Sequence, residues 1–159
     1  MTAPWIAPAL QALLSPLTEN EILALTLYGE ARSEPIEGIV AVGSVIANRA
    51  SDSKQRWGTT IRGVCLQPFQ FSCWNVIGGD KNYARLMQMA QALVARSPEM
   101  KHPAMEQCSW VALGIARKAL QDRVKGSTHY HAASMSPRPA WAQPHIPTIQ
   151  IARHVFYAI

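Results

Sequence analysis

The amino-acid sequence predicts an α+β fold that is mainly α, with a small antiparallel β-hairpin at its C-terminal end. Two observations lead to this fold class. Between residues 18 and 122, apolar residues recur at helical spacing in several segments separated by short loops. The tail from about residue 127 is rich in Thr, Tyr, His, Val and Ile, which is typical of strands. Helices followed by strands, rather than alternating with them, indicate α+β packing.

The helical part begins at TENEILALTLYGE, where Thr18 and Glu21 form a capping box. The first helix is expected over about residues 19–30. In the next segment, SEPIEGIVAVGSVIANRA, Pro35 suits the first helical position because its missing N–H would be unpaired there anyway. The interior of this second helix is apolar nearly all round, which predicts a central, buried helix.

Three more helices are expected. TTIRGVCLQ predicts a short helix capped by one of its two threonines, and KNYARLMQMAQALVAR predicts an amphipathic helix. A further amphipathic helix over about residues 105–122 would turn four apolar residues toward the core: Trp110, Leu113, Ile115 and Leu120.

The tail begins with STHYHAAS, which predicts a strand, and continues with the proline-rich loop MSPRPAWAQPHIPT. IQIARHVFYAI predicts a final strand that pairs with the first. Residues 1–17 are expected to form an N-terminal arm or short helix. Residues 18–159 are expected to form one domain, which is long enough to bury a core.

The chain has 159 residues, of which 48% are hydrophobic and 16% charged, a globular composition that excludes a disordered protein. Its formal net charge of +5 favours an anionic partner: nucleic acid, anionic lipid or an acidic cell-wall polymer. The basic residues are scattered rather than clustered, so nucleic-acid binding is disfavoured. No apolar run approaches the roughly 18 residues that span a bilayer, so no stable membrane insertion is expected.

Three cysteines, Cys65, Cys73 and Cys108, are odd in number and lack CxxC spacing. This pattern argues against a disulfide framework and a sulfur-ligated metal, and free thiols indicate synthesis in a reducing compartment. The N-terminus lacks the basic region of a signal peptide and is interrupted by Pro4 and Pro8. We therefore expect a protein made in the cytoplasm, which needs another factor to release it if it acts outside.

Glu30 is the first candidate for chemistry, because it stands where the apolar pattern of its helix ends, beside Tyr28 and Gly29. Apolar and aromatic neighbours favour the protonated form of a carboxyl group, so a glutamate there can serve as a general acid. Judged by local spacing alone, a solvated carboxylate paired with Arg32 or Arg49 is the more common arrangement.

Other acidic residues offer no obvious second catalytic carboxylate, which most glycosidases have. Glu34 and Glu37 are explained by the positive end of the helix that follows them. A mechanism with a single carboxylate therefore stays open.

Histidines and a cysteine suggest two further alternatives. His129 and His131 share one face of the predicted strand, and His154 could join them across the hairpin as a metal site, although packing or substrate hydrogen bonding is the more common role. Cys73 with a histidine could act as a nucleophile, but nothing local supports it, and buried thiols usually behave as small hydrophobes.

Aromatic residues gather in the expected loops and the first strand rather than at helical spacing. Two interpretations are balanced: they line a cleft that stacks sugar rings or bases, or they pack a small satellite core. The residues are Phe69, Phe71, Trp74, Tyr130 and Trp141.

Four segments in order carry a resemblance: LYGEARSEPIEGIVAVGSVIANR, TTIRGVCLQPFQFSCWN, STHYHA followed by PAWA, and ARHVFY. They resemble the SleB/CwlJ-type cell wall hydrolases, which comprise the catalytic domain of spore cortex-lytic enzymes and related phage and bacterial peptidoglycan hydrolases. The segments extend over about residues 18–157. Two positions depart from the family's usual pattern: GST stands in place of Gly-Ala, and Ala152 stands where glycine usually precedes the closing histidine.

The resemblance implies a lysozyme-like, lytic-transglycosylase-like fold for residues 18–159. It also implies cleavage of the β-1,4 bond between N-acetylmuramic acid and N-acetylglucosamine, with Glu30 as the single catalytic glutamate. Gln70, Ser72, Tyr130 and Trp141 become candidates for lining the glycan cleft. We expect a lytic transglycosylase that forms a 1,6-anhydro product without a metal or other cofactor. The alternatives are a hydrolytic muramidase and a non-catalytic peptidoglycan-binding module.

The expected biological role is that of an endolysin that degrades bacterial cell walls. Its partners would be peptidoglycan glycan strands and a holin-type protein that releases it, and the chain is expected to be a monomer. After release it would act on the cell wall, in the periplasm or at the cell exterior.

Overall fold

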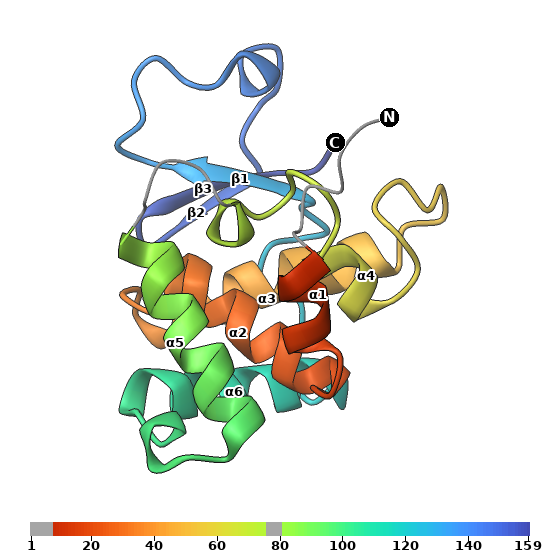
Figure 1. Ribbon diagram of the computed structural model, residues 1–159. Coiled ribbons are helices and arrows are strands. Elements are labelled where there is room, and N and C mark those ends of the chain that lie inside the picture. The colour runs from red at the N-terminus through yellow and green to blue at the C-terminus, as the bar shows by residue number, and fades with distance from the viewer. Residues whose placement is uncertain (1–7, 76–80) are drawn as a thin grey trace.

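The structure is a computed structural model that describes residues 8–75 and 81–159. Helices form the larger part, and a small sheet covers one side of them (Figure 1). The helices are α1 (Pro8–Leu14), α2 (Glu19–Ala31), α3 (Ile36–Ala50), α4 (Ile61–Cys65), α5 (Lys81–Ala95) and α6 (Pro103–Ala116), with short 3-10 turns η1 (Ser72–Trp74), η2 (Pro98–Met100) and η3 (Ala140–Ala142). The strands are β1 (His129–Ala132), β2 (Ile149–Ile151) and β3 (His154–Tyr157). The predicted fold class, mainly α with a small antiparallel C-terminal sheet, is confirmed.

Helix α2 is the centre of the helical part and contacts α3, α4, α5 and α6. Its first turn carries the predicted capping box, in which Thr18 and Glu21 exchange side-chain to backbone hydrogen bonds of 3.2 Å each. Seven consecutive residues, 22–28, are buried, so the helix is enclosed on all sides and not only along one stripe.

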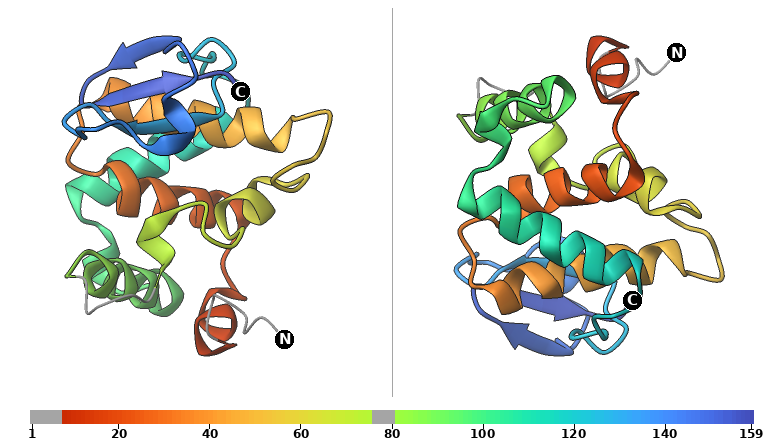
Figure 2. Two further views of the ribbon diagram at one scale, coloured as in Figure 1. Left: turned by 90° about the horizontal axis from the view of Figure 1, so that it is seen from above. Right: turned by 90° about the horizontal axis from the view of Figure 1, so that it is seen from below.

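Helix α3 lies between the other helices and the sheet (Figure 2). Ile39 and Ile46 belong to the main core, whereas Ala41 and Val45 pack with Phe156 of β3 in a smaller second core. The helix begins at Ile36, so Pro35 is its N-cap rather than its first helical residue. Such a difference of one position is ordinary at helix ends.

The sheet has three strands in the order β1-β3-β2, and both pairings are antiparallel. The segment predicted as one final strand is therefore two, because the chain turns at Ala152, whose φ of 51° is left-handed. Across β1 and β3, Tyr130 pairs with Phe156 and His131 pairs with Val155. Since side chains alternate along strands, Tyr130 and His131 point to opposite faces of the sheet.

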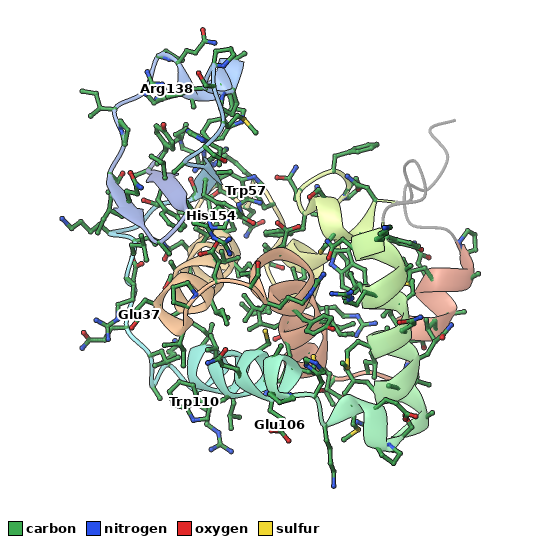
Figure 3. The ribbon with its side chains drawn as sticks, turned by 90° about the vertical axis from the view of Figure 1, so that its left-hand side faces the viewer. Glu37, Trp57, Glu106, Trp110, Arg138 and His154 are labelled. Carbon is green, nitrogen blue, oxygen red and sulfur yellow. The ribbon has the colours of Figure 1, made fainter. Side chains whose placement is uncertain are left out.

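Helix α6 ends at Ala116, earlier than the predicted residue 122, and its inward face also differs from the prediction. Ile115 is buried as expected, but Leu113 is 38% exposed, and Trp110 is 59% exposed and points away from the molecule (Figure 3). The buried positions are Met105, Cys108, Val111, Ala112 and Ile115. This spacing of three and four residues defines the true inner stripe, and Trp110 lies outside it.

The predicted N-terminal arm, residues 1–17, falls partly outside the described residues. Its described part contains α1, whose Leu10 and Leu14 are buried. Arg62 donates hydrogen bonds to the backbone oxygens of Leu14 and Leu17, which satisfies carbonyls at the end of this helix. In the described ranges, no helix combines the length and apolar character that a bilayer crossing requires.

Candidate active site

Glu30 lies in the last turn of α2, half-buried, with a hydrogen-bond donor at each carboxyl oxygen. The backbone N–H of Cys73 donates to Oε1 over 3.0 Å, and the Tyr130 hydroxyl donates to Oε2 over 2.8 Å. The donors come from η1 and β1, which are 43 and 100 residues away in the chain. Three separate parts of the fold thus fix the orientation of one carboxyl group.

Gly29 allows η1 to lie against α2 at this point. A Cβ on Gly29 would stand 2.6 Å from the Cβ and 2.8 Å from the Sγ of Cys73, distances that real side chains do not adopt. The same turn is anchored by Trp74, whose Nε1–H donates to the Thr26 hydroxyl over 3.2 Å. The glycine before Glu30 is therefore what brings the Cys73 N–H within reach of the carboxyl group.

Tyr130 extends from the inner face of the sheet toward α2. Burial raises its pKa well above the usual range, and the Glu30 carboxyl adds to that shift. The phenol therefore stays protonated near neutral pH and serves as a donor. Its ring packs against Phe156 and meets His154 edge-on, with centroids 5.7 Å and 5.1 Å away.

Arg49 supplies a buried positive charge behind the site. It donates to the Thr128 backbone oxygen over 2.7 Å and to Gln70 Oε1 over 3.3 Å, and it lies over the rings of Trp57 and Phe71. Burial lowers its pKa from a very high ordinary value, and the charges of Tyr130 and Glu30 oppose that shift. The guanidinium stays charged.

Like Arg49, Arg32 forms no ion pair with Glu30. It lies over the Tyr28 ring and donates to the Tyr28 backbone oxygen and to Asn82 Oδ1. The part of the chain that the structure describes thus contains no direct ion pair between Glu30 and an arginine. The alternative of a surface carboxylate paired with Arg32 or Arg49 is wrong.

The sequence position of Glu34 indicated a charge at the start of α3, but the structure places its carboxyl group in a buried ion pair. It is 8% exposed and pairs with Arg153 Nε over 3.0 Å, and its Oε1 lies 3.7 Å from His154 Nδ1. Burial lowers the pKa of His154, opposed by the charges of Glu34 and Glu30, so the ring is predominantly neutral at neutral pH. Because His154 also touches Tyr130, it connects the Glu34 ion pair with the Glu30 site.

Of the four predicted cleft residues, Tyr130 is the one whose side chain hydrogen-bonds to Glu30. Gln70 is half-buried and joins the site through Arg49. Ser72 is exposed at the start of η1, directly before Cys73. Trp141 lies against His129, His131 and Tyr157, on the opposite face of the sheet from Tyr130.

The three histidines of the metal alternative do not converge. His129 and His131 share the outer face, as predicted, but His154 pairs with Ala132 in the register and lies on the inner face. His131 is also satisfied by protein groups: its Nδ1 donates to the Ala132 oxygen, and its Nε2 accepts from the Tyr157 hydroxyl. Among the described residues, no three metal-ligating side chains gather at one point.

Cys73 does not suit the nucleophile alternative. Its thiol is buried, and burial raises its pKa well above the ordinary value, so the reactive thiolate is disfavoured. The contribution of this residue to the site is its backbone N–H.

Comparison with known proteins identifies the family. The Cell Wall Hydrolase family matches residues 33–157, which is most of the chain. The chain belongs to this family. The matched segment begins three residues after Glu30 and includes Arg49, Cys73, Tyr130 and His154.

Two curated relatives of this cell wall hydrolase are spore cortex-lytic enzymes, from Oceanobacillus iheyensis and Bacillus subtilis. They are 42% and 41% identical over 52 and 51 residues, which cover 33% and 32% of this chain and 18% and 16% of theirs. The chain thus spans less than a fifth of the length of the relatives it matches.

Two solved structures share the fold of this cell wall hydrolase. The catalytic domain of the germination-specific lytic transglycosylase SleB from Bacillus anthracis superposes with a TM-score of 0.59 at 21% identity, covering 87% of this chain and 93% of the other. The catalytic domain of the Bacillus cereus SleB protein gives 0.55 at 20% identity, covering 87% and 88%. The architecture of helices with a small C-terminal sheet is therefore that of the SleB catalytic domain.

Proposed function

We propose that this chain cleaves the β-1,4 bond between N-acetylmuramic acid and N-acetylglucosamine as a lytic transglycosylase, with Glu30 as its catalytic residue. The observation that carries the proposal is a single carboxyl group held at both oxygens by Cys73 and Tyr130. The nearest acidic residue along the chain, Glu34, is held in an ion pair with Arg153. A mechanism with one carboxylate fits this arrangement best. Membership of the Cell Wall Hydrolase family and the likeness to a lytic transglycosylase support the reaction class.

The proposed reaction has two proton transfers. Glu30 gives its proton to the glycosidic oxygen as the bond between that oxygen and C1 of the muramic sugar breaks, and the departing N-acetylglucosamine leaves with a free hydroxyl. The Glu30 carboxylate then takes the proton of the muramic C6 hydroxyl, whose oxygen bonds to C1. The product is a 1,6-anhydro ring, no water is consumed, and Glu30 is again protonated.

Neighbouring groups make the two roles of Glu30 compatible. Tyr130 and the Cys73 N–H hold the carboxyl group in one orientation throughout, so little reorganisation is needed between acid and base steps. The buried charge of Arg49 stabilises the carboxylate that exists between the two transfers. Gln70, Ser72 and Trp141 stay candidates for contacts with more distant sugars.

A hydrolytic muramidase is the second candidate. The same Glu30 would deprotonate a water instead of the C6 hydroxyl, and the product would carry a free reducing end. A non-catalytic binding module would bind peptidoglycan without releasing fragments. An endolysin-like role, with release by a holin-type partner, is also proposed, and the net charge of +5 suits an anionic cell wall.

Glu30→Gln tests the proposal, with Glu37→Gln as a matched control. Glutamine keeps the shape of the side chain but carries no transferable proton, so lysis of purified sacculi should fall by about 100-fold or more. Glu37 is exposed in the first turn of α3, and Glu37→Gln should lyse sacculi like the unmodified protein. Unchanged lysis by Glu30→Gln would contradict the assignment, and binding without lysis by the unmodified protein would favour the binding module.

A further inference from the structure

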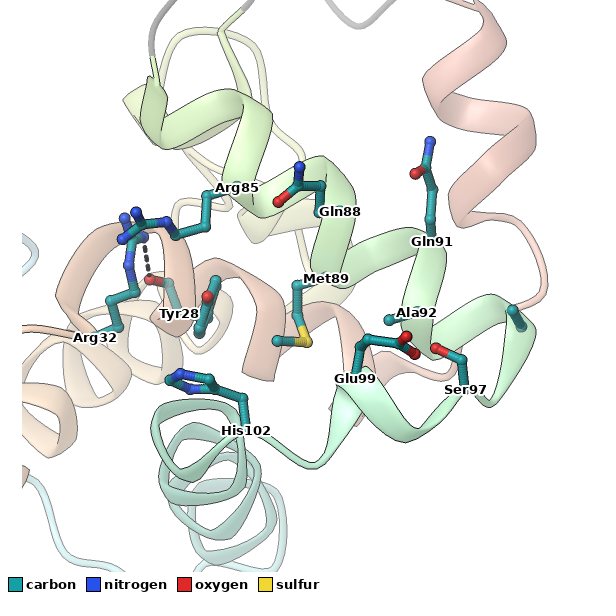
Figure 4. A pocket seen from close by; sticks show the side chains of 11 residues that line it. Tyr28, Arg32, Arg85, Gln88, Met89, Gln91, Ala92, Ser97, Glu99 and His102 are labelled. Atoms are coloured by element: carbon teal, nitrogen blue, oxygen red, sulfur yellow. Dashed lines mark hydrogen bonds between the residues drawn. The ribbon is translucent and has the colours of Figure 1, made fainter.

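A cavity of about 850 Å³ opens on the side of α2 away from the sheet, between α5, η2 and the start of α6 (Figure 4). Glu30 is not among the residues that line it. Arg32 and Arg85 stand at one end, Met89 and Ala92 form the middle, and Glu99 stands at the other end. The cavity therefore has a cationic end, an apolar middle and an anionic end.

Among residues 8–75 and 81–159, no anionic side chain is paired with the arginines of the cationic end. Arg32 donates to neutral acceptors, the Tyr28 backbone oxygen over 3.0 Å and Asn82 Oδ1 over 2.6 Å. Within the described ranges, no carboxylate forms an ion pair with Arg32 or Arg85. Two guanidinium groups at one end of a cavity favour a ligand with a carboxylate, which their planar forks bind well.

The opposite end suits an amine. A hydrogen bond from Ser97 lowers the pKa of Glu99, so its carboxyl is anionic at neutral pH. Glu99 points into the cavity beside Ser97 (Figure 4). Between the charged ends, Met89 and Ala92 offer an apolar surface for the carbon chain of a ligand.

The cationic end adjoins the turn that carries Glu30. Arg32 follows Glu30 by two residues, and Asn82 of α5 binds both the Gly29 backbone oxygen and the Arg32 guanidinium. A ligand that extends from the Glu30 site around this turn therefore reaches the arginines first and Glu99 last.

We propose that this cavity binds the peptide stem of peptidoglycan, with a stem carboxylate on Arg32 and Arg85 and the side-chain amine of the diamino acid on Glu99. The inference rests on the proposed function. The stem is attached to the muramic sugar, whose C1 reacts, and its glutamyl carboxylate precedes its diamino acid. This order of charges, outward from the glycan, matches the order from the Glu30 turn to the far end of the cavity.

The first experiment compares two substrates: intact peptidoglycan, and the same glycan strands after an amidase has removed the stems. The readout is the ratio of kcat/KM on intact to stripped strands. Arg85 is exposed on the surface of α5, so Arg85→Gln should fold normally. Loss of one charge-assisted contact should lower the ratio by about tenfold. Arg117, the exposed C-cap residue of α6, does not line the cavity, so Arg117→Gln should leave the ratio unchanged.

The second experiment measures binding directly with the synthetic peptide Ala-γ-Glu-diaminopimelate. Amide resonances of residues around the cavity should shift when the peptide is titrated into the unmodified protein, and Arg85→Gln and Glu99→Gln should each weaken the effect. An unchanged ratio for Arg85→Gln, or no peptide-induced shift, would overturn the inference. A failure of the proposed function is distinguishable, because the unmodified protein would then cleave neither substrate while the peptide titration still reports on the cavity.

Discussion

The two faces of the sheet carry similar residues in different surroundings. On the inner face, Tyr130 and His154 turn toward α2 and meet Glu30 and Glu34. On the outer face, Tyr157 and His131 hydrogen-bond to each other. A tyrosine hydroxyl thus hydrogen-bonds to a carboxyl group on one face and to a histidine ring nitrogen on the other. The role of each tyrosine and histidine in the sheet therefore depends on the face it occupies and not on its residue type.

Tyr130→Phe and Tyr157→Phe form the sharpest test of this division. Tyr130→Phe removes a donor to Glu30, so kcat should fall by about 10- to 100-fold while the thermal midpoint changes little. Tyr157→Phe leaves His131 Nε2 buried without a partner, so the free energy of unfolding should fall by about 1–2 kcal/mol while kcat stays near normal. Activity assays and denaturant unfolding of both variants would refute the division if the effects were exchanged.

Gly29→Ala changes the surroundings of Glu30 on α2, whereas Tyr130→Phe changes them on the sheet. The new methyl group overlaps Cys73, so η1 must shift, with an expected cost of about 1–3 kcal/mol in unfolding free energy and a loss of activity as the N–H donor moves. Gly43→Ala is the control, because its nearest contact is the Ile115 side chain at 3.2 Å and it lies away from Glu30. Equal losses of activity in the two variants would contradict the role given to Gly29.

His129 makes the outer face sensitive to acid. Burial, followed by the charge of Arg49, lowers its pKa to about 4, below an unfolded value near 6.5. The unfolded chain then binds more protons than the folded chain between these values. The stabilisation is therefore complete above pH 6.5 and is lost as pH falls toward 4. Because the ring is only partly buried, solvent screening reduces the loss to on the order of 2 kcal/mol. His129→Asn should flatten the dependence of unfolding free energy on pH, whereas a slope like that of the unmodified protein would argue against it.

Trp141→Ala should have the smallest effect. The ring is 38% exposed and contacts outer-face residues, so kcat should be unchanged. If the exposed ring stacks on a distant sugar, as we predict, KM for long glycan strands should rise by about threefold. Kinetics on long and short strands measure this effect, and a large loss of kcat would mean that the outer face takes part in the reaction.

Local signals in the sequence predicted much of the fold. Residues that are close together in the sequence produce three of the confirmed features: the capping box at Thr18, the buried α3 and the strand at His129. The split of the last strand escaped prediction because Ala152 adopts a left-handed turn without glycine. The outward position of Trp110 escaped because a helix with apolar residues on several sides does not reveal which stripe packs inward.

The central residues of the candidate site were predicted, but the contacts that hold them in place were not. Glu30 and Tyr130 were singled out, yet their hydrogen bond joins residues 100 positions apart, which no local spacing reveals. The Cys73 N–H carries no signal at all, because nearly every residue has one. Glu34 was explained as a helix-end charge, since its partner Arg153 lies 119 positions away. Arg49 was considered only as a partner for Glu30, although its place at the end of the buried helix α3 is a local signal from which a buried charge could have been inferred.

Mass spectrometry of the soluble fragments released from purified peptidoglycan tests the central claim most directly. A single carboxyl group that acts first as acid and then as base on the sugar's own hydroxyl predicts muropeptides that end in 1,6-anhydro-N-acetylmuramic acid, and their absence from a Glu30→Gln digest. Fragments with free reducing ends alone, or the same anhydro fragments from Glu30→Gln, would contradict it.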